Sequence, residues 1–489
     1  MVRLDERAKP GKNGSPQGAS SLEVASGRRS LLTHKEGRWL LGFGDAIALL
    51  APMVLATLVR HTERPVAFTN QEIAALLMGV LIWIVLAISG NLYSLSRASS
   101  WSRTHRATVG AILAIGVARL MYQIPAPEGD LMIAYRYAGV AFIGFALWRV
   151  AFYVLAKFIP FTMRVLIVGA GVSGSILAEE LHGKAVRGDQ DYQLVGFIDD
   201  DSEKVGSIKG GYPVLSTSSD AMTVIESHQV DTLALAVNKV QIGADVFSLL
   251  INAKERGIRV CSMPALYESL TEKIVVEHVG DNWGIMFPME QAPHPFVHDV
   301  LVRCVDIVVS VLGLILTLVA APVISVLNLA TRNRGPLFTT QPRTGKGGTE
   351  FQMLRFRIED LSEAEIASAW RDDAPTLSKV GKYLRNTGLE NLPTSWNLLR
   401  GEMSLIGPQP ERPEFTLLLS ETIPFFRARH SVKPGVTGWA QVMYHYGVSE
   451  EDSLVKLQYD LYYIKHRSPA MDLRILAKAT KLFFSRRSR

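Results

Sequence analysis

The sequence predicts a helical bundle in a membrane, then an α/β domain with a parallel sheet, then a second α/β domain attached to the membrane by a hairpin. Four apolar stretches lie within the first 160 residues, a glycine-rich turn follows a β-branched run near residue 168, and another apolar stretch lies at 307–330. Mean hydropathy is +0.16 over 489 residues, which is high for a soluble chain. Because the apolar residues are clustered, the excess indicates membrane segments rather than one large core.

The N-terminal 160 residues divide into a tail and a bundle. Residues 1–37 are rich in Gly, Ser, Lys and Arg with few large apolar side chains, so we expect a disordered basic tail. The apolar stretches each approach the roughly 20 residues that a spanning helix needs, which predicts a four-helix transmembrane bundle over residues 38–160. These stretches are Trp39–Val59, Ile73–Ser89, Ala107–Ile124 and Leu131–Ala156. Arg136 and Arg149 interrupt the fourth, so hydropathy defines its limits poorly.

The basic residues set the expected orientation. They are concentrated before the first span, and none lies between Ile124 and Leu131. The positive-inside rule therefore places the N-terminus and everything after Lys157 in the cytoplasm. A pI near 9.1 suits anionic partners such as lipid headgroups, phosphates or nucleic acid, and charge does not choose among them. Cys261 and Cys304 are far apart, which argues against a disulfide framework and fits a reducing compartment.

A dinucleotide-type fingerprint follows the bundle. The run RVLIVGAGVSG carries G-x-G-x-x-G at Gly169, Gly171 and Gly174, between a predicted strand and a predicted helix. Asp199 lies about 25 residues later, roughly where an acid could bind a ribose. With further strands at Gln193–Ile198 and Thr232–Val237, we expect a Rossmann-like domain over residues 161–275. The fingerprint supports the fold more strongly than it supports a cofactor, so NAD or another nucleotide is left open as its ligand.

A linker and an apolar segment come next. Residues 276–298 contain three prolines and are expected to be a linker. The segment at 303–332 has basic residues on both sides, which favours a hairpin that enters and leaves the bilayer by one face. Pro322 lacks an amide hydrogen and clashes with the preceding turn, so we expect the helix to break there. A fifth full span kinked at Pro322 is the alternative.

The stretch Gly335–Asp360 is a glycine-rich basic loop between two predicted strands. Backbone amides of such a loop, with Arg343 and Lys346 nearby, could hold phosphate oxygens. The Walker A spacing is missing, and a solvated hairpin turn explains the pattern equally well.

More specific motifs follow at Leu377–Phe415, Arg429–Val442 and Lys456–Thr480. Together with the stretch from Gly335, they resemble the bacterial sugar transferase family, the monotopic phosphoglycosyl transferases that begin polysaccharide assembly on a polyprenyl phosphate carrier. The likeness covers about residues 299–485, so residues 299–489 are assigned to a transferase domain. The spans and the Rossmann-like domain match the large form of the family.

The resemblance implies an architecture and a reaction. Its re-entrant helix breaks at a Ser-Pro pair, and here Ala321-Pro322 takes that place. The reaction is the Mg²⁺-assisted transfer of a hexose 1-phosphate from a UDP-sugar to undecaprenyl phosphate, in which a carboxylate attacks the phosphorus next to the sugar and UMP leaves. The implied location is the bacterial inner membrane with the transferase domain on the cytoplasmic face. Membrane lipids, a second copy of the chain and downstream glycosyltransferases are the implied partners, with no nucleic acid.

The implied site departs from the family pattern. Where the family has L-D-E-L-P, this chain has Leu389-Glu390-Asn391-Leu392-Pro393, so Glu390 and Asn391 take the catalytic and metal-binding positions. An amide oxygen binds Mg²⁺ less well than a carboxylate. Gln409 replaces the arginine of the family's P-R-P, which removes a bidentate phosphate contact. The residues expected to contact substrate phosphate are Arg343, Arg357, Arg385, Gln409, Arg412 and Asp460.

Plainer interpretations stand beside these. Arg385 could simply end a helix, where a cation meets the helix dipole. Asp460 could lie on an ordinary solvated helix face, and Trp439 and Tyr462 are more often packing residues. The C-terminal run from Leu473 is expected to form an amphipathic surface helix.

The sequence is also compatible with two alternative functions. A non-catalytic paralogue that binds a partner or the lipid carrier would account for the simultaneous changes at Glu390, Asn391 and Gln409. A membrane-anchored sugar-nucleotide dehydratase or reductase would need Tyr-x-x-x-Lys inside its nucleotide domain. The one suggestive pair, Tyr153 and Lys157, precedes the first strand of that domain.

Overall fold

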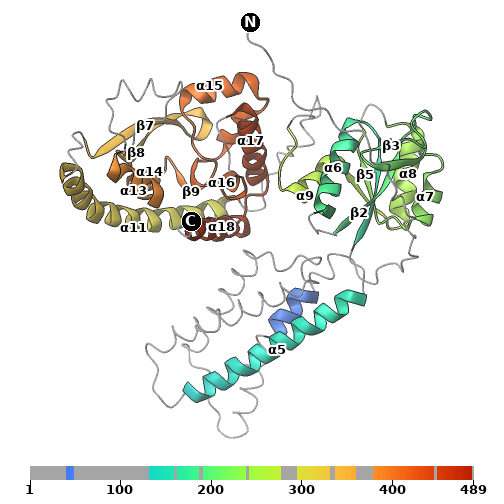
Figure 1. Ribbon diagram of the computed structural model, residues 1–489, viewed down its shortest axis with the longest axis horizontal. Helices are drawn as coiled ribbons and strands as arrows, with labels where there is room; N and C mark the ends of the chain where they lie inside the picture. The colour runs from blue at the N-terminus through green and yellow to red at the C-terminus, as the bar shows by residue number, and fades with distance from the viewer. Residues whose placement is uncertain are drawn as a thin grey trace, which may run out of the picture.

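A computed structural model describes residues 40–48, 131–158, 162–186, 191–237, 242–276, 295–330, 336–358, 378–444 and 449–486. Figure 1 shows two α/β bodies beside each other, with the long helix α5 below them. The tail at 1–37, residues 277–294 of the predicted linker and the predicted spans Ile73–Ser89 and Ala107–Ile124 lie outside the described residues, whereas residues 295–298 of that linker are helical. The four-helix bundle therefore remains a prediction.

Helix α5 (Leu131–Phe158) coincides with the fourth apolar stretch and packs against a short helical segment at 40–48. Arg149, which interrupts that stretch, is 3% exposed and donates from Nε to Asp45 Oδ1 over 2.9 Å. Trp148 Nε1 also donates to the Leu41 carbonyl, over 3.3 Å. A charge inside an apolar helix is thus paired with an opposite charge on its neighbour, as burial in an apolar setting requires.

The first α/β body is a six-stranded sheet in the order β3-β4-β2-β1-β5-β6, parallel except for the β3–β4 pair. Its strands are β1 (Met163–Val168), β2 (Tyr192–Ile198), β3 (Ile208–Lys209), β4 (Tyr212–Ser216), β5 (Thr232–Leu235) and β6 (Arg259–Ser262). Its helices are α6 (Val172–Val186), α7 (Ala221–Ser227), α8 (Ala244–Glu255) and α9 (Met263–Thr271). The predicted parallel sheet with a glycine-rich turn after its first strand is confirmed.

Both faces of this sheet are covered. Alternate residues of β1 face opposite sides, so Val165 and Ile167 pack with α6 and α9, while Leu166 and Val168 pack with α7 and α8. Figure 1 shows α6 and α9 on the side of the sheet that faces the second body. A strand buried on both faces explains why the sequence of β1 is continuously apolar.

The second body begins with α11 (Pro295–Ala330), which is followed by the antiparallel hairpin of β7 (Phe338–Thr344) and β8 (Glu350–Phe356). Its short turn η4 (Lys346–Gly348) is exposed, as expected of a solvated hairpin turn, and contact of this turn with phosphate stays a prediction. The remaining elements are α13 (Lys379–Thr387), η5 (Leu389–Thr394), α14 (Ser395–Arg400), β9 (Ser404–Ile406), α15 (Pro413–Thr422), η6 (Phe426–Ser431), β10 (Gly435–Thr437), α16 (Trp439–Met443), α17 (Glu450–Lys465) and α18 (Pro469–Arg486).

Helix α11 continues through Pro322, so the expected break into two helices is wrong for this structure. The reason is packing on both sides of the proline. Ala321 and Ile324 contact a core formed with Phe356 and Val380, which supports the end of α11 despite the missing amide hydrogen. In Figure 1 the helix runs along the base of the second body and curves upward at one end. Among the described residues it is the one helix long and apolar enough to cross a membrane.

The two bodies are joined by a buried contact after α9. Ile274, Val275 and Val276 are buried against Leu457 and Phe426 of the second body, and the Ile274 amide donates to the Gln458 carbonyl over 3.1 Å. Trp439 is fully buried, and its Nε1 donates to the Glu272 carbonyl over 3.2 Å. Trp439 is therefore a packing residue. Met471 and Ile475 of helix α18 pack in the core around Trp439, so the predicted amphipathic helix has one face on protein.

Candidate active site

The 3-10 helix η5 holds the two residues expected to be catalytic. Glu390 is 8% exposed and Asn391 is half-buried beside it. Both accept hydrogen bonds from one guanidinium: Arg355 Nη2 lies 2.5 Å from Glu390 Oε1, and Arg355 Nε lies 3.0 Å from Asn391 Oδ1. The other carboxylate oxygen, Glu390 Oε2, is buried and makes no hydrogen bond within the described part of the chain. One carboxylate oxygen is therefore fixed by Arg355, and the other is buried without a hydrogen bond among the described residues.

The strand β8 that carries Arg355 is tied to the helix that follows η5. Asn397 accepts from the Leu354 amide over 3.0 Å and donates to the Gln352 carbonyl over 2.7 Å. Thr394 Oγ1 donates to the Leu354 carbonyl over 3.1 Å. Because Thr394 and Asn397 are 1% exposed, these bonds are shielded from water and hold Arg355 at a fixed distance from η5.

Helix α11 lies directly beneath this unit. A side chain at Gly313 would place its Cβ 2.0 Å from Ser395 Oγ, so glycine is needed for the approach of α11 to α14. Arg303 donates to the carbonyls of Leu398 and Leu399, each over 2.7 Å, and so satisfies the C-terminal end of α14. Asp306 accepts from the Leu405 amide over 2.7 Å. The apolar helix and the catalytic segment are thus packed as one unit.

A second group of charged side chains is centred on Arg429, which is 2% exposed. Its Nη2 lies 2.7 Å from Asp460 Oδ2 and 2.9 Å from the Gln409 carbonyl, and its Nη1 lies 3.5 Å from Glu411 Oε1. Lys456 pairs with Glu411 and reaches Gln409 Oε1 at 3.5 Å. Burial raises the pKa of Glu411, but Lys456 and Arg429 outweigh this effect and hold its pKa at about 2. Glu411 is therefore ionised at neutral pH.

Arg343 connects the two groups through the β7–β8 hairpin. It lies on β7, opposite Phe351, and its Nη1 donates to the Pro410 carbonyl over 3.1 Å. Arg355 lies opposite Thr339, so both arginines project from the same face of the hairpin, about four residues apart along the strands. Burial, with a contribution from neighbouring positive charges, lowers the pKa of Arg343 to about 10, so it remains a cation at neutral pH.

The other expected phosphate contacts occupy different settings. Arg357 follows β8 on the same face as Arg355 and is half-buried. Arg385 is exposed in the last turn of α13, the end-of-helix position that the sequence also allowed. Arg412 is half-buried immediately before α15. Asp460 is 1% exposed and turned toward Arg429, so it lies within the charged cluster rather than on a solvated face.

The glycine-rich turn of the first body has the geometry of its fingerprint. Gly169 has φ of 108°, and a Cβ at Gly174 would lie 2.1 Å from the Gly169 carbonyl oxygen, so both positions require glycine. A Cβ at Gly171 would meet nothing. Asp199 accepts from the Ala170 amide over 2.8 Å and pairs with Lys204 over 3.2 Å. Its carboxylate thus already supports the turn, where the sequence suggested a ribose contact.

Three residues of the site were missed by the sequence reasoning: Arg355, Arg429 and Lys456. Arg355 lies two positions before Arg357 in the run LRFR, and the alternation of a strand would have put both on one face. Arg429 and Lys456 stand in the motifs around RHSVKPG and KLQYDL, but their contacts join segments far apart in the chain. Sequence spacing gave no signal for those pairings.

Comparison with known proteins agrees with this geometry. The family model described as bacterial sugar transferase matches residues 297–486, and one described as a CoA-binding domain matches residues 103–264. The first match contains η5, the β7–β8 hairpin and α17, so it covers every residue of the two charged groups.

Several curated relatives match a part of this chain. The UDP-N-acetylgalactosamine-undecaprenyl-phosphate N-acetylgalactosaminephosphotransferase of Aeromonas hydrophila is 33% identical over 46% of this chain and 52% of its own length. The UDP-glucose:undecaprenyl-phosphate glucose-1-phosphate transferase of Escherichia coli is 32% identical over 44% of this chain and 47% of its own. The protein of the same description in Caulobacter vibrioides is 35% identical over 37% of this chain and 68% of its own.

The matches span about half or less of the length of the first of these relatives, and most of the shorter Caulobacter vibrioides protein. The region that the family model matches contains the carboxylate of η5, the arginines of the hairpin and helix α11 from residue 297 onward. This chain belongs to the bacterial sugar transferase family.

Proposed function

We propose that this chain transfers a hexose 1-phosphate from a UDP-sugar to undecaprenyl phosphate, the first step in assembling an exopolysaccharide, capsule or O-antigen repeat unit. The observation that carries the proposal is the state of Glu390. One of its oxygens is held by Arg355, and the other is buried with no partner among the described residues. The substrates follow from the names of the relatives, which act on undecaprenyl phosphate with UDP-glucose or UDP-N-acetylgalactosamine.

Glu390 can act as the nucleophile in two balanced displacements. Its Oε2 attacks the phosphorus next to the sugar, forming a P–O bond while the bond to the UMP oxygen breaks and UMP leaves with the electron pair. A phosphate oxygen of the lipid then attacks the same phosphorus, and the Glu390 carboxylate leaves. Both substrates are large anions. A covalent intermediate divides the transfer between them into two separate steps.

Mg²⁺ is the cofactor expected from the family. The described residues contain no group of three carboxylate, His or Cys ligands, but Mg²⁺ is usually held by one or two carboxylates together with substrate phosphates. Because Glu390 Oε2 is the attacking atom and Oε1 is paired with Arg355, the residues of η5 would supply little of such a site, and the diphosphate would supply most of its ligands. When bound, the ion would neutralise charge on the diphosphate.

The cations of the hairpin suit the rest of the substrate. Arg343 and Arg357 lie on the same face of β7–β8 as Arg355, where their guanidinium groups can meet the oxygens of a diphosphate. Gln409 cannot replace the phosphate contact of the family's arginine, but Lys456 lies 3.5 Å from its side-chain oxygen. A cation from α17 therefore lies beside this position, but it is buried and paired with Glu411.

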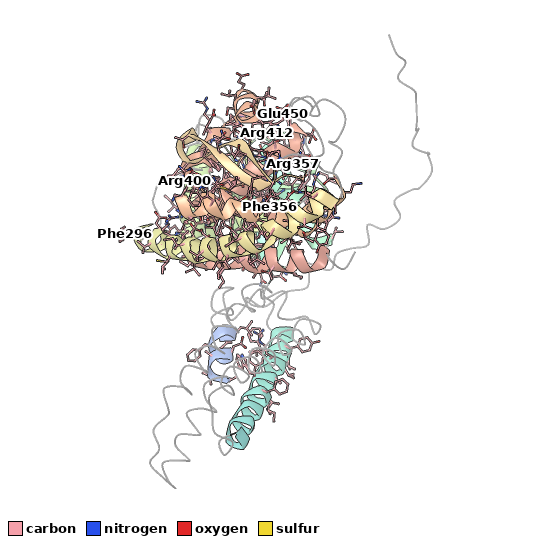
Figure 2. All side chains as sticks on the ribbon, turned by 90° about the vertical axis from the view of Figure 1, so that its left-hand side faces the viewer. Phe296, Phe356, Arg357, Arg400, Arg412 and Glu450 are labelled. Atoms are coloured by element: carbon pink, nitrogen blue, oxygen red, sulfur yellow. The ribbon has the colours of Figure 1, made fainter. Side chains whose placement is uncertain are left out.

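We propose that α11 holds the site against the cytoplasmic face of the bacterial inner membrane. Figure 1 and Figure 2 show α11 and α18 along the base of the second body, on the side facing α5, and Figure 2 places Phe296 there and Arg412 and Glu450 at the opposite end. One side of α11 packs on η5 and α14. The other is exposed and apolar, with Val308, Leu316, Leu318, Val319, Val326 and Leu329 each at least 56% exposed. Such a face suits lipid rather than water.

The curvature of the unbroken helix α11 supports its association with one face of the bilayer. Membrane lipids, a second copy of the chain, downstream glycosyltransferases and a nucleotide on the Rossmann-like domain are further partners expected from the resemblance. A non-catalytic paralogue is not favoured, because the carboxylate of η5 is retained, oriented and left with a free oxygen.

The test is a reaction with purified protein in lipid nanodiscs, undecaprenyl phosphate, Mg²⁺ and a panel of UDP-sugars, read by UMP release and by intact mass. We expect UMP release with one sugar and a sugar phosphate adduct on Glu390 when the lipid is omitted. Glu390→Gln should lose both, whereas Glu450→Gln, at an exposed position on α17, should keep both. No UMP release with any sugar, or an adduct that survives in Glu390→Gln, would refute the proposal.

A further inference from the structure

Asn391 turns its amide oxygen toward Arg355, which leaves its amide nitrogen on the other side. Arg355 Nε lies 3.0 Å from Asn391 Oδ1, while Nη2 of the same guanidinium lies 2.5 Å from Glu390 Oε1. A guanidinium has only donors, so the atom of the amide that faces it must be the oxygen. The NH₂ group is then directed away from Arg355, with two hydrogens to donate.

This orientation conflicts with a role for Asn391 as a metal ligand. Only the oxygen of an amide can ligate Mg²⁺, and that oxygen already accepts a hydrogen bond from Arg355, whose positive charge repels a metal ion at the second lone pair. Freeing it would break the hydrogen bond and leave Arg355 Nε in a largely buried position without that partner, which is costly for a charged donor. The bonds of Thr394 and Asn397 to β8 hold the two elements together, so Arg355 cannot readily withdraw.

We infer that Asn391 is a hydrogen-bond donor to a phosphoryl oxygen of the nucleotide diphosphate, and that Arg355 is the positioning residue that fixes its amide in this orientation. The inference deepens the proposed function and rests on it, since the ligand is the diphosphate of the UDP-sugar. It replaces the expectation that Asn391 binds the metal.

The charges of the site agree with this role. Arg355 and Glu390 together are neutral, and Asn391 adds no charge. An acid at position 391 would make the group negative, attracting a divalent cation but repelling the diphosphate. A neutral donor instead favours contact with the anion before any metal is bound, because hydrogen bonds to charged groups are the stronger ones.

The inference is tested with UDP, a diphosphate that carries no sugar to transfer, bound to the full chain in nanodiscs with excess EDTA. Calorimetry should detect UDP binding to the wild type without metal. Asn391→Ala and Asn391→Asp should weaken it about tenfold, equivalent to about 1.4 kcal/mol. Arg355→Lys keeps the positive charge but loses the planar guanidinium that donates to both Glu390 and Asn391. It should weaken UDP binding to a similar degree.

Two controls separate binding from folding. Asn386→Asp makes the same chemical change at an exposed position on α13, and Arg400→Lys does so for an exposed arginine on α14. Both should bind UDP as the wild type does. A second measurement uses Mn²⁺ and its electron paramagnetic resonance signal: Asn391→Asp should bind Mn²⁺ more tightly than wild type, and Asn391→Ala should bind it equally.

The outcomes distinguish this inference from the proposed function. If wild type releases UMP but Asn391→Ala binds UDP normally in EDTA and loses Mn²⁺, Asn391 is a metal ligand and the inference is wrong while the function stands. If Asn391→Asp leaves UDP affinity unchanged, the donor role is wrong. If wild type neither binds UDP nor releases UMP, both proposals fail together.

Discussion

Arg429 and Asp460 form an ion pair that is almost completely removed from water, with 2.7 Å between Nη2 and Oδ2 and both residues at most 2% exposed. The pair joins η6 to α17, and through the Gln409 carbonyl it also fixes the segment that enters α15. Breaking a buried pair from one side leaves an uncompensated charge, which is far more costly than losing a surface pair.

We therefore expect Asp460→Asn to destabilise the second body by about 3–5 kcal/mol. Thermal unfolding in detergent, followed by tryptophan fluorescence, measures this change. Glu451→Gln, at an exposed position on the same helix, should leave the midpoint unchanged. An Asp460→Asn protein with an unchanged midpoint but weakened UDP binding would instead show that Asp460 contacts the substrate.

Asp45 and Arg149 should behave as a unit. Each single replacement, Asp45→Leu or Arg149→Leu, leaves one charge buried between apolar helices and should lower the unfolding temperature. The double replacement removes both charges and should recover most of the loss, since apolar pairs often match buried ion pairs in stability. A double-mutant cycle measures the coupling. Additive effects of the two replacements would contradict the pairing.

His430 should make stability depend on pH. Burial, together with Arg429, lowers its pKa from 6.5 to about 4. Between these values the unfolded chain binds the proton and the folded chain does not, so stability is complete above about pH 6.5 and falls toward pH 4. The slope contributed by this group is at most about 1.4 kcal/mol per pH unit. His430→Gln should flatten the dependence of stability on pH between pH 4 and 6.5. An unchanged slope would mean that other groups cause the pH dependence.

Gly313 should be intolerant of side chains. A leucine there would push α11 away from Ser395 and disturb η5, so Gly313→Leu should reduce UMP release by more than tenfold while the protein still sediments with membranes. Leu318→Ala, on the exposed face of α11, is the matched control and should retain activity. Full activity of Gly313→Leu would mean that the close approach is not needed for the site.

Local patterns in the sequence predicted much of the fold. The β-branched run before Gly169 gave β1 and its parallel sheet, and the apolar run at 131–156 gave α5. The antiparallel strand β3 was not predicted, because two residues beside a turn carry too little periodicity. The continuity of α11 through Pro322 was also missed, since it depends on a core with Phe356 and Val380 that no local pattern shows.

The candidate site was only partly predictable. The motif around Glu390 located the carboxylate by resemblance, but the orientation of Asn391 depends on Arg355, about 35 residues away on another element. The pairing of Arg429 with Asp460 and of Lys456 with Glu411 likewise joins different motifs. Such contacts depend on tertiary packing. Each motif alone therefore shows a charged residue but not the residue with which it pairs.

The contact of Gly313 with Ser395 also links the depth of α11 in the bilayer to the position of Glu390. Since α11 and η5 are packed as one rigid unit, the helix cannot sink or rise in the bilayer without carrying Glu390 the same distance. On the proposed function, the thickness and packing of the lipid leaflet then set the height of the nucleophile relative to the phosphate plane. Turnover would respond to acyl-chain length even where no lipid touches the reacting atoms.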